Sequence, residues 1–177
     1  IDALLAGRNT GIYVDGTFGR GGHTRLLLSK LDEHARVYAF DKDPQALAVA
    51  AELEQEDSRF KIIHASFADL KEALAELGIE QVDGVMADLG VSSPQLDQAE
   101  RGFSFMKDGP LDMRMDNSQG PTAAEWLTQI EEEALANIIF KYGEERYSRR
   151  IAKAIKAAGY IDTTAKLAEI VKVAHPK

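Results

Sequence analysis

The residues best suited to chemistry lie in a glycine-rich segment, 14–23, that follows a short apolar run. Four glycines fall within the seven residues 16–22, more than a turn between a strand and a helix requires. Glycine lets the backbone approach a ligand closely, and both dinucleotide sites and S-adenosylmethionine sites use this property. We therefore expect a cofactor-binding turn, with a simple connecting turn as the alternative.

Two features of this segment favour S-adenosylmethionine over a dinucleotide. Thr24 stands where the G-x-G-x-x-G pattern has its third glycine. Asp15 places a carboxylate where a pyrophosphate would be repelled, whereas the ammonium group of a methionine moiety tolerates that charge. The glycine pattern alone fits either cofactor, so a nicotinamide-dependent oxidoreductase is the rival enzyme class.

Two further candidates follow the next two apolar runs. Asp41 lies about 20 residues beyond the glycine turn, where a carboxylate suits the two hydroxyls of a ribose. Asp43 precedes Pro44 and is more simply the N-cap of a helix. Phe67 follows the third apolar run, where it could pack on an adenine or, as readily, in the core.

Asp88 follows the fourth apolar run and is the candidate catalytic residue. Ligands of open parallel sheets bind outside the carboxyl ends of the strands, so Asp88 is expected at the same crevice as Asp15 and Asp41. A buried aspartate that caps the following loop is the competing interpretation. The four histidines show no spacing typical of a metal site, and no Ser-His-Asp set can be assigned.

The elements that must position these residues alternate along the first ninety residues. Short β-rich runs are separated by stretches with helical spacing of apolar residues. The runs are 12–14, 36–40, 60–63 and 82–87, and the helical stretches are 23–31, 44–53 and 67–77. This order predicts an α/β fold with a parallel sheet and helices on both faces.

The remaining chain divides into a long loop and three helices. Segment 89–120 lacks periodicity but is too rich in apolar residues for a linker, so we interpret it as an ordered active-site loop. Helices are predicted over 122–140, beginning with a capping box, then over 144–158 and 163–174. The predicted domains are therefore a cofactor-binding domain, 1–120, and an all-helical insertion domain, 121–177.

Composition and charge set limits on function. The chain has no cysteine and no apolar run near the roughly 20 residues of a membrane helix, which indicates a cytoplasmic protein and no membrane partner. It starts without an initiator methionine and stops without a finishing element, so we expect it to be part of a longer polypeptide.

Net charge is −8, yet residues 141–177 hold 9 Lys/Arg against 4 Asp/Glu. On a helix, four of these cations would form a basic stripe that could contact RNA phosphates: Arg146, Arg149, Arg150 and Lys153. The alternative is that they pair with nearby carboxylates and hold the insertion in place, the candidates being Glu144, Glu145, Asp112 and Asp116.

Five motifs together closely resemble the bacterial 16S ribosomal RNA cytosine-N4 methyltransferases of the MraW or RsmH type. The motifs are Asp15-Gly-Thr-Phe-Gly-Arg-Gly-Gly-His23, Asp88-Leu-Gly-Val-Ser-Ser-Pro-Gln-Leu-Asp97, Arg101-Gly-Phe-Ser-Phe105, Asp108-Gly-Pro-Leu-Asp-Met-Arg-Met-Asp116 and Tyr142-Gly-Glu-Glu-Arg146. The resemblance implies a class I, Rossmann-like methyltransferase with a helical insertion, whose remaining strands are absent from this chain. It also implies a substrate cytosine in the decoding region of the small ribosomal subunit.

The resemblance further assigns cofactor contacts to Gly21, Gly22, His23, Asp41, Phe67, Asp88 and Gln95. The cytosine N4 amine is a poor nucleophile, because its lone pair is delocalised into the ring. We therefore expect Asp88 to orient the amine through a hydrogen bond. Phe103 or Phe105 would stack on the base once it is outside a duplex. A noncatalytic RNA-binding module for ribosome assembly is the rival from another class.

Overall fold

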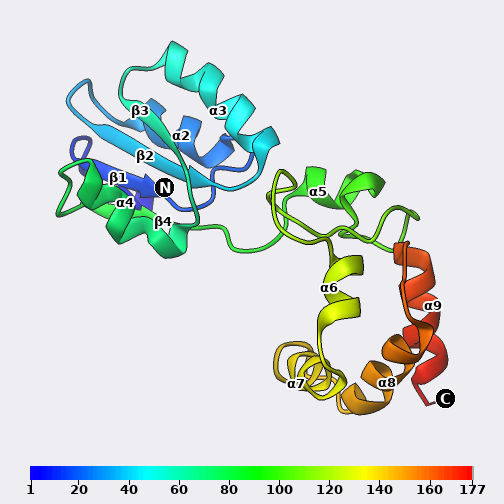
Figure 1. Ribbon diagram of the computed structural model, residues 1–177. Coiled ribbons are helices and arrows are strands. Elements are labelled where there is room, and N and C mark those ends of the chain that lie inside the picture. Colours follow the sequence, from blue (N-terminus) through cyan, green and yellow to red (C-terminus); the bar gives the residue numbers. More distant parts are fainter. Residues whose placement is uncertain (177) are drawn as a thin grey trace. The chain divides into compact units, whose positions relative to one another are not determined.

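The computed structural model describes residues 1–176, which form two compact units, Ile1–Gly90 and a second one that begins at Val91 (Figure 1). This division lies before the predicted boundary at residues 120 and 121. The reason is that the loop packs with the helices that follow it, since Leu111 is buried in the core of the second unit.

The first unit is built on one parallel sheet with the strand order β3-β2-β1-β4. Its strands are β1 (Ile12–Asp15), β2 (Arg36–Asp41), β3 (Phe60–His64) and β4 (Gly84–Met86). All four predicted strands are confirmed, as is their parallel pairing. Asp15 is in register with Ala39 of β2 and Met86 of β4, so the carboxyl ends of three adjacent strands meet at one edge of the sheet.

Helices cover both faces of this sheet. Successive residues of a strand point to opposite sides, and here both sides present apolar residues that must be buried. The helices are α1 (Asp2–Leu5), α2 (Gly22–Lys30), α3 (Pro44–Glu56) and α4 (Leu70–Glu76), the last preceded by the short 3₁₀ helix η1 (Phe67–Asp69). Tyr13 and Val37 pack with side chains of α2 and α3. Val14 and Phe40 pack on the other face against Leu74 of α4. The predicted α/β class is therefore confirmed.

The second unit is helical within the described residues. It contains α5 (Ser93–Asp97), the 3₁₀ helix η2 (Ala99–Arg101), α6 (Ala123–Gln129), α7 (Glu132–Gly143), α8 (Ser148–Ala158) and α9 (Thr164–Ala174). Its core joins Leu127 of α6, Leu135 of α7 and Ile151 and Ile155 of α8. The predicted capping box at Thr122 is confirmed.

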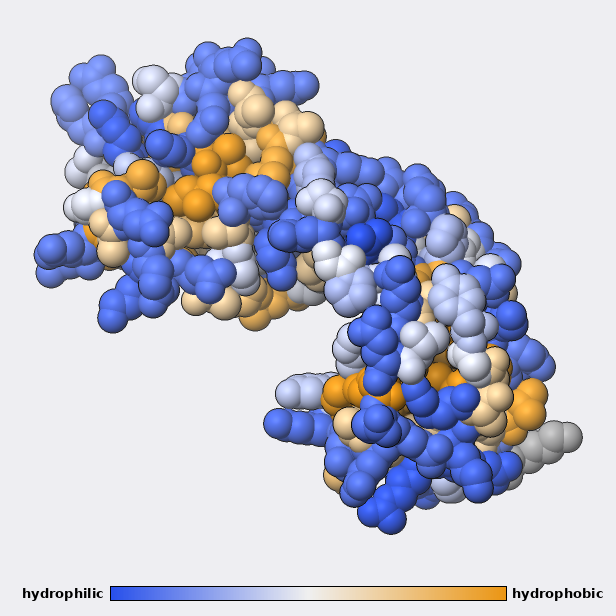
Figure 2. All heavy atoms as spheres, viewed as in Figure 1, coloured by the Kyte–Doolittle hydropathy of each residue, from blue (hydrophilic) through white to orange (hydrophobic). Residues whose placement is uncertain are grey.

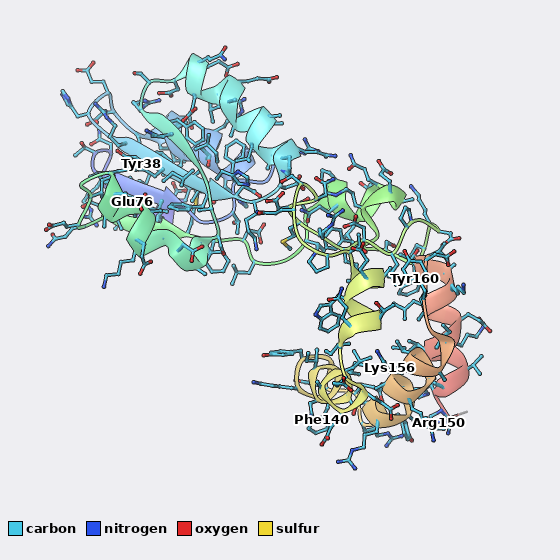
Figure 3. All side chains as sticks on the ribbon, viewed as in Figure 1. Tyr38, Glu76, Phe140, Arg150, Lys156 and Tyr160 are labelled. Atoms are coloured by element: carbon cyan, nitrogen blue, oxygen red, sulfur yellow. The ribbon has the colours of Figure 1, made fainter. Side chains whose placement is uncertain are left out.

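Two predicted helices differ from the structure. The stretch 122–140 is broken between α6 and α7, where Ile130 and Glu131 are extended. Lys156 of α8 stabilises this break by donating hydrogen bonds to the carbonyls of Leu127 and Thr128 at the end of α6, each at 3.0 Å (Figure 3). The stretch 144–158 begins late, at Ser148, because Glu144 adopts a left-handed conformation that ends α7.

The predicted loop 89–120 is ordered in part through hydrogen bonds to the start of α9 and to the residues just before it. Asp108 accepts a hydrogen bond from the Ala165 N–H at 3.0 Å, and the Thr164 N–H donates to the Gly109 carbonyl at the same distance. The Leu111 N–H donates to the Asp162 carbonyl at 2.9 Å. The loop is thus part of the helical unit. No helix among residues 1–176 has the length and apolar character needed to cross a membrane.

Candidate active site

The glycine turn joins β1 to α2 and is held between the two neighbouring strands. The Phe18 N–H donates to the Phe40 carbonyl of β2 at 3.0 Å, and the Gly16 N–H donates to the Met86 carbonyl of β4 at 2.8 Å. Gly21, the N-cap of α2, has φ +77°, and a Cβ there would lie only 2.7 Å from the ring of the buried Phe18. Glycine is therefore required at this position by both conformation and space.

The first turn of α2 exposes backbone donors at the predicted cofactor residues Gly22 and His23. Both residues are exposed, and no acceptor for either N–H is found among the described residues. Gly21, as N-cap, provides no side chain to satisfy them. Unpaired N–H groups at a helix N-terminus favour an anionic ligand group such as a carboxylate.

Asp15 lies at the end of β1, where it braces the turn internally. Its buried carboxylate accepts hydrogen bonds from the Thr24 hydroxyl at 2.7 Å and from the Thr17 N–H at 3.0 Å. Burial raises the pKa of Asp15, although both hydrogen bonds act in the opposite direction. Thr24, which stands at the third glycine position of the G-x-G-x-x-G pattern, is therefore a hydrogen-bond partner of Asp15.

Asp41, at the end of β2, holds the same turn from the other side. One of its carboxylate oxygens accepts from the Gly19 N–H at 2.8 Å, and the other accepts from the Asp43 N–H at 2.9 Å. Each oxygen has a second lone pair that could accept from a ligand hydroxyl. The prediction for Asp43 is confirmed, since its side chain caps α3 by accepting from the Gln45 N–H.

Phe67 begins η1, directly beside the glycine turn. A Cβ at Gly16 would lie 3.2 Å from the Cβ of Phe67, so the absence of a side chain at Gly16 makes room for this close approach. Phe67 is 46% exposed. A half-exposed ring at this place fits a ligand-contacting role better than the alternative of core packing.

Asp88 follows β4 and is fastened to the glycine turn by its backbone. Its N–H donates to the Thr17 hydroxyl oxygen at 2.6 Å. The residue is exposed, and within residues 1–176 its carboxylate accepts no hydrogen bond. The structure therefore disfavours the interpretation of Asp88 as a buried, loop-capping aspartate and leaves its carboxylate accessible to a ligand.

Sequence reasoning missed the roles of two threonines at this site. Thr17 connects the turn after β1 to the segment after β4, and Thr24 connects Asp15 to α2. The spacing of Thr24 from Asp15 was a usable signal, because a hydroxyl in the first turn of the helix can reach back to the strand end. Thr17 and Asp88 are 71 residues apart in sequence, so no local pattern could link them.

Gln95 is the one predicted cofactor residue in the second unit. It is buried at the start of α5, where the Ser92 N–H donates to its side-chain oxygen at 3.0 Å as half of a capping box. Its contact with the cofactor stays a prediction.

The two candidate stacking residues of the loop differ in exposure. The ring of Phe103 is partly buried, with the guanidinium of Arg101 centred 6.0 Å from it. Phe105 is 69% exposed, and its neighbour Met106 is exposed too. Figure 2 shows that both units have apolar side chains at their surface. Of the two phenylalanines, Phe105 has more of its surface available to a base.

The four predicted RNA-binding cations are all exposed, but they do not share one helix: Arg149, Arg150 and Lys153 lie on α8, whereas Arg146 is in the turn before it. None of them forms an ion pair with another described residue. Arg146 instead lies over the ring of Tyr147, 4.6 Å from its centroid. The opposite face of α8 is buried through Ile151, Ala152 and Ile155.

Two of the carboxylates proposed as partners of these cations have other contacts. Asp112 forms a bidentate pair with Arg114, at 2.7 and 2.9 Å, which lowers the pKa of Asp112. Glu145 accepts from the Tyr147 N–H at 2.7 Å. The alternative that the cations fasten the insertion through ion pairs is therefore not observed among the described residues.

A parallel sheet with helices on both faces, a glycine turn and carboxylates at its strand ends defines a Rossmann-like α/β domain. The whole chain, residues 1–177, matches the MraW methylase family, and the protein belongs to that family.

Three relatives, each named ribosomal RNA small subunit methyltransferase H, illustrate the similarity. The chain is 80% identical to the Acinetobacter baylyi protein and 78% identical to that of Acinetobacter baumannii (strain ATCC 17978), over all 177 residues. It is 60% identical to the Psychrobacter cryohalolentis protein over 167 residues, 94% of this chain. The chain spans 58% of the length of the two Acinetobacter proteins and 49% of the third.

Proposed function

We propose that this protein transfers a methyl group from S-adenosylmethionine to the N4 amine of a cytosine in the decoding region of 16S ribosomal RNA. The observation that carries the proposal is the exposed Asp88 carboxylate, which is tied through Thr17 to the glycine turn. Membership of a methylase family supports a methyltransferase over a nicotinamide-dependent oxidoreductase. Such a substrate places the protein in the cytoplasm.

The residues at the strand ends fit S-adenosylmethionine by their chemistry. The N–H groups of Gly22 and His23 suit the carboxylate of its methionine moiety. Asp41 suits the ribose hydroxyls, since both of its oxygens keep acceptor capacity, and the half-exposed Phe67 suits the adenine. When bound, this cofactor supplies a methyl group on a positively charged sulfur.

Asp88 would act on the amine that receives the methyl group. A carboxylate that accepts a hydrogen bond from one N4 hydrogen fixes the direction of the nitrogen lone pair, and its charge stabilises the positive charge that develops on nitrogen. The hydrogen bond from the Asp88 N–H to Thr17 restrains the backbone that carries this carboxylate. The group is thus positioned before the base arrives.

Contact with the RNA is assigned to two places in the helical unit. Phe105 is the better candidate to stack on the target base because it is more exposed than Phe103. The cations of α8 would hold phosphates, because they are exposed and have no ion-pair partner among residues 1–176. The partner would be 16S ribosomal RNA, free or within the small subunit.

The test is transfer of a labelled methyl group to 16S RNA and to small subunits, with the whole protein and its Asp88→Asn variant. Asparagine keeps the size and one acceptor but removes the charge. We expect transfer to slow by roughly 10²–10³-fold, with cofactor affinity less affected. Near-normal turnover by Asp88→Asn would rule out the catalytic role of Asp88, and RNA binding without any transfer by the unmodified protein would favour the noncatalytic module.

A further inference from the structure

The motif Tyr142–Arg146 lies outside the glycine turn and the strand ends, and it forms a distinct feature of the helical unit. It contains the turn between α7 and α8, where Glu144 has φ +52° and α8 begins at Ser148. The last turn of α7 and the first turn of α8 therefore lie at the same end of this helical pair. We call this region the hairpin end, residues 137–153.

Large aromatic side chains at the hairpin end are mostly in contact with water. Phe140 is 61% exposed and Tyr142 is 74% exposed. Phe140 also lines a surface depression together with Asn137, Lys141 and Glu144. Phe140 and Tyr142 are two residues apart on α7 and therefore project from different sides of it, so each ring is separately available to stack on a ligand.

The aromatic residues are interleaved with cations. The Lys141 amine lies 5.2 Å from the centroid of the Tyr142 ring. Arg146 follows in the turn before α8, and Arg149, Arg150 and Lys153 lie in the first two turns of α8; all four are exposed. Figure 3 shows Phe140 of α7 and Arg150 of α8 near the same end of the helical unit. The carboxylates of this region are Glu144 and Glu145, so positive charge predominates.

We propose that the hairpin end binds single-stranded RNA, with unpaired bases stacked on Phe140 and Tyr142 and phosphates held by the neighbouring cations. Aromatic rings interleaved with cations suit a single strand, because every base has a face that can stack and every nucleotide carries a phosphate. A duplex offers the phosphates but keeps its base faces inside. The inference rests on the proposed function and adds to it the unpaired state of this RNA segment.

The decisive experiment compares three variants of the whole protein: Phe140→Ala/Tyr142→Ala, Arg149→Ala/Arg150→Ala, and the control Tyr160→Ala. Tyr160 is 60% exposed and follows the end of α8, apart from Phe140 and Arg150 in Figure 3, so it controls for the loss of exposed aromatic surface. Affinity for a single-stranded segment of 16S RNA, and for the same segment in a duplex, is measured by fluorescence anisotropy at several salt concentrations.

We expect the aromatic variant to bind the single strand about 10- to 100-fold more weakly, with an unchanged salt dependence and unchanged duplex affinity. The arginine variant should weaken binding to both RNAs and reduce the slope of log affinity against log salt for the single strand by about 1.4. The control should bind like the unmodified protein. This pattern separates stacking from phosphate contact.

Two results would overturn the proposal. One is single-strand affinity that is unchanged in the aromatic variant while the arginine variant loses affinity, which leaves the proposed function intact. The other is a change of oligomeric state or loss of a copurifying protein in the aromatic variant with unchanged RNA affinity, which assigns the face to a protein partner. If the unmodified protein binds no 16S RNA at all, the proposed function fails first.

Discussion

The glycine turn of the first unit and the loop 108–116 of the second are both rich in charged residues, but they use these residues differently. In the turn, Asp15 and Asp41 are held by backbone N–H groups and a hydroxyl. In the loop, Asp112 forms a bidentate pair with Arg114 and Asp108 accepts from the start of α9. The carboxylates of the turn are positioned without counter-ions, whereas in the loop Asp112 is neutralised by Arg114, two residues away.

The loop 108–116 uses its charged residues to order its own backbone. Arg101 is buried and donates to the carbonyls of Arg114 and Met115, at 3.2 and 2.9 Å. Its guanidinium therefore fixes the path of the loop. Carboxylates that carry no counter-ion remain able to bind the donors or the positive charge of a ligand, and in the first unit Asp41 and Asp88 meet this condition.

The largest expected effect tests whether Asp41 serves a ligand as well as the turn. Asp41→Ala removes the acceptor of the Gly19 N–H and the proposed ribose contact, so cofactor affinity should fall by about 2–4 kcal/mol, measured by calorimetry. Asp43→Ala is the matched control, because it removes a buried carboxylate two residues away that caps α3. The control should lose about 1 kcal/mol of stability and keep its affinity. Unchanged affinity in a folded Asp41→Ala protein would contradict the assignment.

A second, smaller effect is the opposite response of the two regions to pH. The pKa of Asp112 is lowered, chiefly by the hydrogen bonds from Arg114. Its contribution to stability is therefore present above the ordinary pKa and is lost as pH falls through the lowered value. The pKa of Asp15 is raised by burial. Stability linked to Asp15 is therefore greatest below its ordinary pKa and is lost as pH rises through the raised value.

Asp112→Asn and Asp15→Asn separate these contributions. At neutral pH we expect Asp112→Asn to destabilise the helical unit by about 1 kcal/mol, a difference that shrinks in acid. The stability of Asp15→Asn relative to the unmodified protein should instead increase as pH rises, because asparagine keeps an acceptor for the Thr17 N–H without a buried charge. Hydrogen exchange of each unit, followed from acid to neutral pH, measures both changes in stability. If both stability differences changed with pH in the same direction, the two regions would not hold their carboxylates in the different ways described above.

The sequence was sufficient to predict those elements and caps that depend on contacts between residues close together in the chain. Alternating runs predicted all four strands, and Asp43 and Thr122 were recognisable as N-caps because a cap contacts residues two or three positions away. The same local reasoning failed at Ile130, since apolar residues continue at helical spacing through the break between α6 and α7. What holds that break, Lys156, is 29 residues from Leu127.

The site could be predicted as a set of residue types but not as a set of contacts. Parallel strands bring Asp15, Asp41 and Asp88 to one edge of the sheet, and this follows from topology. The hydrogen bond that the Thr17 hydroxyl accepts from Asp88 and the one that Thr24 donates to Asp15 depend on how the turn folds between β2 and β4. That arrangement arises from tertiary packing, which local patterns do not specify.

The smallest expected effect concerns how each region forms its tight turn. The glycine turn has glycine at its left-handed positions, with φ of +57° at Gly19 and +77° at Gly21. The hairpin end has Glu144 in the same region of backbone space. Glu144→Gly should therefore raise the thermal stability of the helical unit, by about 0.5–1 kcal/mol, because glycine at the residue after a helix has no Cβ penalty.

Glu144→Gln separates backbone relief from charge, since it removes the carboxylate and keeps the strained backbone. Both substitutions remove a negative charge from the proposed RNA surface, so both should raise affinity for single-stranded RNA slightly, and more at low salt. Only Glu144→Gly should also raise the melting temperature. Equal stabilisation by both variants would show that charge repulsion, and not left-handed backbone strain, limits the stability of the hairpin end. The hairpin end would then differ from the glycine turn in its charge and not in backbone strain.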